Sequence, residues 1–247
     1  MPTRPASRQR RQVAAGRPAL RTLAGRIRHL LVRTLLVALL APPVLLLAYR
    51  FLPPPITPLM LIRLGEGEGL EKQWQPLARI APALPEAVVA AEDNRFCAHW
   101  GFDWPELEGQ IGALLAGERA RGASTITMQT AKNLFLWPER SLLRKLLEAA
   151  LTPQIALLWP KRRVIEVYLN IVELGPGIYG VEAAAQSYFG KPAAALSRRE
   201  AALLAAVLPH PRASSPARPS AYLEDRARTI RSRIEQLGPM LDCVRAG

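Results

Sequence analysis

Apolar residues recur at spacings of three and four positions through most of the chain after residue 84. Such spacings place side chains on one face of a helix and therefore predict a series of helices. We expect them at 85–99, 104–121, 125–136, 141–159, 160–174, up to Gly190, at 197–208 and at 223–237. Alternation typical of a strand is limited to a short segment near Met60, which also suits a second contact with a membrane surface. The pattern predicts a mostly α-helical domain.

An uninterrupted apolar run precedes this domain. Residues 34–49 are uncharged, and an arginine stands on each side of them. A membrane-spanning helix needs about 20 residues, so we expect a transmembrane anchor over 34–52 whose flanking arginines reach the interface. Pro42 and Pro43 are expected to kink it. A cleaved signal peptide is the main alternative, but the basic region is too long and no good cleavage site follows; flanking charges disfavour a buried helix.

The two sides of the apolar run differ in charge. The net charge is +13, but of 33 basic residues 11 arginines precede the first acid, Glu66, which leaves 22 basic against 20 acidic residues. By the positive-inside rule we predict a disordered, cytoplasmic basic tail at 1–33. Across the membrane we predict a membrane-proximal linker at 53–83 and a domain at 84–247. A nearly neutral domain argues against nucleic-acid binding.

The two cysteines, Cys97 and Cys243, stand far apart in the sequence. They form no CxxC pattern and have no histidine at metal-ligand spacing, so they do not indicate a metal site. They could pair in an oxidising compartment or both stay free. The sequence leaves both states open.

The stretch 92–103, EDNRFCAHWGFD, carries the first candidate for chemistry. One face of the first predicted helix carries Val88, Glu92, Phe96 and His99, which stand at positions i, i+4, i+8 and i+11. Glu92 is thus aligned with an apolar stripe, where a carboxyl group binds its proton more tightly and becomes a useful base near neutral pH. The alternative is a structural carboxylate that pairs with Arg95 or with a backbone amide.

The block 122–133, GASTITMQTAKN, is a candidate anion site. Ser124 or Thr125 can cap a helix there, and a helix N-terminus offers N–H groups to a phosphate. Gln129 and Lys132 follow along one face of that helix. A capped surface helix without a ligand is the alternative.

The block 144–148, RKLLE, places two cations near a second acid. Arg144 and Lys145 stand four and three residues before Glu148, so both can reach its carboxylate. An ion pair of this kind on a surface is common and contributes little by itself.

These three blocks, followed in order by KRRVIEVYLN and GPGIYGVEAAAQSYFGK, resemble the peptidoglycan glycosyltransferases of glycosyltransferase family 51. The monofunctional, membrane-anchored form is the most similar, and the resemblance covers about 84–211 and, weakly, the chain up to Gly238. It implies a lysozyme-like domain in which 104–121 belongs to a small lobe near the bilayer. The implied reaction polymerises lipid II into β-1,4 glycan strands, with inversion and release of undecaprenyl diphosphate, outside the bacterial inner membrane.

At matching positions the resemblance implies that Glu92 is the general base for the acceptor 4-hydroxyl and that Glu148 assists at the diphosphate. The implied substrate contacts are Ser124, Thr125, Gln129, Lys132, Arg140, Arg144 and Lys145. No cofactor is required, although Glu148 could hold a divalent cation such as Mg or Mn. The implied partners are lipid II, the growing lipid-linked glycan, the membrane and other cell-wall synthesis proteins. Two positions depart from the family: Met128 stands where Gln is more common, and Cys97 where Pro is.

Two other functions fit parts of this pattern. A lysozyme-like or lytic glycan-cleaving enzyme would also use one essential glutamate in a helical domain, but it needs neither a diphosphate site nor an anchor. A non-catalytic membrane scaffold for cell-wall assembly would tolerate replacement of both glutamates. The two cationic blocks favour the glycosyltransferase.

Overall fold

The computed structural model describes residues 17–118 and 122–245. They divide into two units, of which the first ends at Leu45 and the second begins at Leu46. Helix α1 (Arg17–Tyr49) forms the described part of the first unit and ends in the second. Its segment Gly25–Tyr49 is long and apolar enough to cross a membrane, in line with the predicted anchor. Because α1 is already helical at Arg17, the expectation of a disordered tail is wrong for 17–33, while 1–16 lie outside the described residues.

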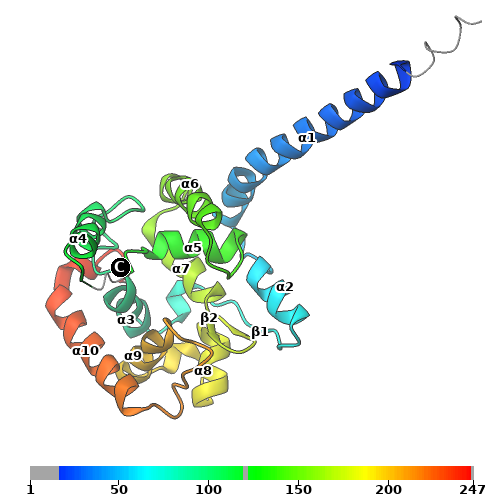
Figure 1. The fold of residues 1–247 in the computed structure, drawn as a ribbon. Coiled ribbons are helices and arrows are strands. Elements are labelled where there is room, and N and C mark those ends of the chain that lie inside the picture. Colours follow the sequence, from blue (N-terminus) through cyan, green and yellow to red (C-terminus); the bar gives the residue numbers. More distant parts are fainter. Residues whose placement is uncertain (1–16, 119–121, 246–247) are drawn as a thin grey trace, which may run out of the picture. The chain divides into compact units, whose positions relative to one another are not determined.

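The second unit is mostly helical, as predicted, and Figure 1 shows its elements. The helices are α2 (Pro58–Gly65), α3 (Ala83–Glu92), α4 (Trp104–Leu115), α5 (Ile126–Phe135), α6 (Leu142–Leu158), α7 (Lys161–Ile171), α8 (Val181–Phe189), α9 (Arg198–Val207) and α10 (Ala221–Leu237). Short 3-10 turns are η1 (Leu77–Arg79), η2 (Ala193–Ala195) and η3 (Gly238–Leu241). Helix α3 packs against α9 and α10, and α5 packs against α6 and α7 (Figure 1).

A small sheet joins three short strands, β1 (Glu71–Lys72), β2 (Glu173–Gly175) and β3 (Ile178–Tyr179). Strand β3 lies in the middle, parallel to β1 and antiparallel to β2. The strand expected near Met60 is wrong, because that segment is α2. Thr57 caps this helix by accepting from the Met60 N–H, and Pro58 occupies its first turn, which together start a helix.

Three predicted helices end earlier than expected. The helix at 104–121 stops with α4 at Leu115, while 119–121 lie outside the described residues. The helix at 85–99 stops with α3 at Glu92, because Asp93 leaves the helical conformation with φ −160° and ψ 77°. Its carboxylate accepts instead from the Ile126 N–H of α5 at 2.9 Å. The helix predicted to end near 174 stops at Ile171, and Leu174 is buried in β2.

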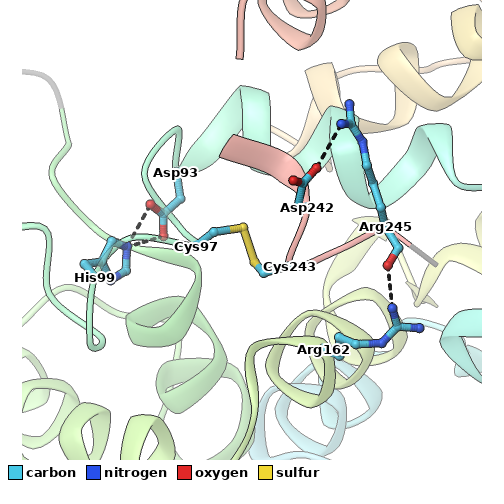
Figure 2. The surroundings of a disulfide bond; sticks show 7 residues. All are labelled: Asp93, Cys97, His99, Arg162, Asp242, Cys243 and Arg245. Atoms are coloured by element: carbon cyan, nitrogen blue, oxygen red, sulfur yellow. Dashed lines mark hydrogen bonds and ion pairs between the residues drawn. A yellow bond between two sulfur atoms is a disulfide. The ribbon is translucent and has the colours of Figure 1, made fainter. Parts of the chain in front are cut away.

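A disulfide joins the two cysteines that the sequence left open. Cys97 follows α3, Cys243 lies beyond α10, and their Cα atoms are 5.6 Å apart. Figure 2 shows this bond between Asp93 and His99 on one side and the contacts of Arg245 on the other. The disulfide therefore ties the segment after Glu92 to the end of the described chain.

Candidate active site

Glu92, the last residue of α3, has a side chain that is only 15% exposed. Gln129 Nε2 donates to its Oε2 at 3.0 Å, and Arg226 Nη2 of α10 lies 3.6 Å from its Oε1. Burial raises the pKa of Glu92, and the Gln129 hydrogen bond, Arg226 and Lys132 oppose that rise. The predicted increase in proton affinity is confirmed.

The alternative prediction, that Glu92 is a structural carboxylate paired with Arg95, has the wrong partner. Arg95 Nε lies 3.8 Å from the Asp103 carboxylate, and the ion-pair partner of Glu92 is Arg226, 134 positions away. No local sequence pattern predicts a contact between residues so far apart in the chain. Arg226 is thus a residue of the site that sequence reasoning missed.

Asp93, the residue after Glu92, forms a buried pair with His99, and the two residues are 7% and 8% exposed. His99 Nδ1 accepts from the Gly101 N–H at 3.1 Å, so its Nε2–H donates to Asp93 Oδ1 at 2.9 Å. Figure 2 shows the two side chains facing each other. Because Asp93 also accepts from the Ile126 N–H, this pair fixes the end of α3 against the start of α5.

The N-terminus of α5 is capped as predicted, and two of its first amides already have protein partners. Thr125 accepts from the Met128 N–H at 3.2 Å and donates its hydroxyl proton to the Gly101 carbonyl at 2.6 Å. The Ile126 N–H already binds Asp93. The expectation that these amides receive a phosphate is therefore wrong for Ile126 and Met128, because protein oxygens occupy them.

Gln129 connects Glu92 to the core. Its amide nitrogen faces Glu92 and, at 3.4 Å, the Ser124 carbonyl. Its amide oxygen accepts from the Tyr168 hydroxyl at 2.9 Å. Tyr168 lies on α7 and is fully buried. Sequence reasoning did not connect Tyr168 to the site.

Glu148 on α6 is 3% exposed, and both of its oxygens carry a cation. Arg144 binds Oε1, and Lys145 Nζ lies 3.0 Å from Oε2. Lys145 also donates to Ser124 Oγ at 2.8 Å, which links α6 to the segment before α5. The pairing predicted from the spacing is confirmed, and it is more buried than a surface ion pair.

Glu148 fits a protein-held divalent cation poorly. Its two oxygens are taken by Arg144 and Lys145. Among the described residues no group of three His, Cys, Asp or Glu side chains is placed to ligate a metal. Such a cation would have to take most of its ligands from a diphosphate and water.

Lys132 of α5 lies within electrostatic range of both acidic positions. Burial lowers the pKa of its ammonium group, while Glu148 and Glu92 both raise it. The Lys132 ammonium group therefore interacts electrostatically with both carboxylates. Arg140, the remaining predicted cation, is exposed between α5 and α6 and makes no hydrogen bond or ion pair with a described residue.

Apolar side chains on α4 and α6 face outward. The apolar face predicted for 141–159 exists, but its first two turns are not covered. The apolar side chains of α4 and α6 exposed by half or more are Trp104 at 58%, Leu115 at 84%, Leu142 at 77%, Leu143 at 60%, Leu146 at 60% and, in the last turn of α6, Leu157 at 77%. Exposed apolar surface of this kind marks contact with lipid or with another protein.

The family model described as Transglycosylase matches residues 60–235, which include every residue of this site from Glu92 to Arg226. The chain belongs to the transglycosylase family. It is accordingly a glycosyltransferase with a lysozyme-like domain. The match begins at 60, within α2, and includes β1, so it starts ahead of the expected domain start near 84.

Curated relatives agree with this assignment. A biosynthetic peptidoglycan transglycosylase of Rhodospirillum centenum is 57% identical over 191 residues, which cover 77% of this chain and 83% of the relative. Proteins of the same name from Caulobacter vibrioides and Ectopseudomonas mendocina are 49% and 50% identical, over 83% and 84% of this chain and 89% and 88% of the relatives.

Proposed function

We propose that this transglycosylase polymerises lipid II into β-1,4 glycan strands with release of undecaprenyl diphosphate. The names of its relatives support a peptidoglycan product. The observation that carries the proposal is a pair of acids: the mostly buried Glu92 with raised proton affinity, and the buried Glu148 that binds two cations. Lys132 interacts electrostatically with both. Glycosyl transfer from a diphosphate needs a base and a charge sink together, and this arrangement supplies both.

Glu92 acts as the base. The 4-hydroxyl oxygen of the acceptor sugar attacks the anomeric carbon of the donor, and its proton passes to the Glu92 carboxylate. The bond between the anomeric carbon and the diphosphate oxygen breaks, and its electron pair leaves with the diphosphate. Attack opposite the leaving group inverts the anomeric centre from α to β.

The cations stabilise the leaving diphosphate. Lys132, Arg144 and Lys145 are held before substrate arrives, so they need no reorganisation as negative charge develops. Glu148 keeps Arg144 and Lys145 in place. Exposed Arg140 is free to approach the same phosphates. Ser124, Thr125 and Gln129 complete the proposed substrate surface, although the Thr125 hydroxyl is already bonded to the Gly101 carbonyl.

The membrane holds both enzyme and substrate in this proposal. The apolar helix anchors the chain once, with its basic N-terminal side in the cytoplasm and the catalytic unit in the periplasm. The exposed apolar side chains of α4 and α6 contact the bilayer or the lipid tails of the substrate. Other cell-wall synthesis proteins are its expected partners.

An assay with two substrates tests the proposal against a glycan-cleaving enzyme. Purified full-length protein in detergent is incubated with lipid II and, separately, with finished peptidoglycan. We expect polymer and released undecaprenyl diphosphate from lipid II, and no soluble fragments from finished glycan. Cleavage of finished glycan without polymer from lipid II would overturn the proposal.

A further inference from the structure

The side-chain amide of Gln129 is bonded on both of its ends. Its nitrogen donates to Glu92 Oε2 at 3.0 Å and faces the Ser124 carbonyl at 3.4 Å. Its oxygen accepts from the Tyr168 hydroxyl at 2.9 Å. Glu92, ionised, and the Ser124 carbonyl are acceptors only, whereas the Tyr168 hydroxyl is the one donor to the amide oxygen among the described residues.

Tyr168 is suited to hold that amide in place. Its side chain is fully buried, from α7, which packs against α5. Burial, followed by the nearby Glu92, raises the pKa of the Tyr168 phenol, so the hydroxyl keeps its proton and remains a donor. The link therefore runs from a rigid core residue through Gln129 to the carboxylate at the end of α3.

We propose that Tyr168 is a positioning residue, whose hydroxyl fixes the Gln129 amide in the orientation that donates a hydrogen bond to the Glu92 carboxylate. This inference rests on the proposed role of Glu92 as the base. Without the hydroxyl, the amide oxygen of the half-buried Gln129 loses its donor on the side that faces the fully buried Tyr168. An unpaired buried acceptor is unfavourable, so the side chain rotates away to find one.

Rotation of the Gln129 amide would destabilise the ionised form of Glu92. The Gln129 hydrogen bond favours the carboxylate over the carboxylic acid. The other groups that face Glu92 are Arg226 of α10 and Lys132 of α5, which also favour its charge, and Asp93, which opposes it. Loss of the Gln129 donor leaves these groups unchanged and raises the proton affinity of Glu92.

The test compares pH profiles of kcat/KM for lipid II polymerisation by full-length protein in detergent. Tyr168→Phe removes one hydroxyl and keeps the ring. A general base works only when ionised, so we expect the acid limb of its profile to move to higher pH, with a loss of rate that grows as pH falls. Gln129→Leu should shift the limb in the same direction. Tyr168→Phe combined with Gln129→Leu should give the profile of Gln129→Leu alone, because Tyr168 acts only through Gln129.

Two further variants separate positioning from packing. Tyr179→Phe is the matched control, because Tyr179 is also fully buried and its hydroxyl has no hydrogen-bond partner among the described residues. We expect the acid limb of the Tyr179→Phe pH profile to match that of the wild type. Replacement of Tyr168 by 3-fluorotyrosine keeps the ring and supplies a hydroxyl that is at least as good a donor, so it should restore the wild-type limb.

An unchanged acid limb in Tyr168→Phe overturns the inference, and so do additive shifts in the double variant or a shifted limb with 3-fluorotyrosine. The proposed function fails on a different result. If Glu92→Gln polymerises lipid II at the wild-type rate, Glu92 is not the base, whatever the Tyr168 variants do.

Discussion

Reduction of the disulfide between Cys97 and Cys243 is expected to lower the stability of the unit that begins at Leu46. The bond closes a loop between positions 146 residues apart, which contains nearly the whole described domain from α4 to α10. Cross-linking positions that far apart removes many conformations from the unfolded chain. We expect the native contacts around the bond to remain in its absence, so that the effect falls mainly on the unfolded state.

The loop length sets the magnitude. In the chain-entropy description a closed loop of this size contributes about 5 kcal/mol, at the upper end of what disulfides supply. For a unit of this size 1 kcal/mol corresponds to roughly 2–4 °C in Tm. Reduction should therefore lower Tm by about 10–20 °C.

Thermal unfolding followed by near-ultraviolet circular dichroism measures this shift. Wild-type protein in detergent is compared with and without a reducing agent, beside Cys97→Ala/Cys243→Ala as a variant that reductant cannot affect. The reduced wild type and the double variant should melt at similar, lower temperatures. Equal Tm values for oxidised wild type and the double variant would refute the reasoning.

Three further outcomes follow from the site and the fold. Lys132→Ala should raise the KM for lipid II and lower kcat by about 10²-fold or more, as expected for a lost charge-stabilising group. The control Lys191→Ala, which removes a cation bound to Glu200, should leave both kinetic constants unchanged. Burial raises the pKa of Glu92, so polymerisation should fall as pH drops through that pKa while circular dichroism stays native; a pH-independent rate between pH 4 and 8 would contradict this role. Gly180→Ala should lower the free energy of unfolding by about 3 kcal/mol or more. Gly180 has φ +80°, and an added Cβ would lie 2.8 Å from the Asn170 carbonyl oxygen. An unchanged midpoint of urea unfolding would contradict this prediction.

Local patterns predicted the parts of this fold that local interactions build. Helices were expected to begin near 125 and 141, with Ser124 or Thr125 as the cap of the first. The structure has Thr125 as the cap of α5 and Ser141 as the cap of α6. The pairing of Arg144 and Lys145 with Glu148 also follows from positions three and four residues apart on one helix.

Contacts between distant segments decided what the sequence could not show. The helix predicted through His99 ends at Glu92, because the Asp93 carboxylate is recruited by an N–H group 33 residues later. Arg226 and Tyr168 join the site from α10 and α7, and neither carries a short-range signal of that role. Periodicity likewise located the apolar face of α6, but it does not tell whether protein covers that face.

Polymerisation of lipid II by Glu92→Gln tests the central claim most directly. The substitution keeps the size of the side chain and removes its ability to take a proton. Glu86→Gln is the matched control, because Glu86 lies on the same helix with an 18% exposed side chain and pairs with Arg245 instead. We predict that Glu92→Gln keeps the wild-type Tm within a few degrees and forms no glycan polymer, while Glu86→Gln remains active. Polymer formation by Glu92→Gln at the wild-type rate would contradict the account.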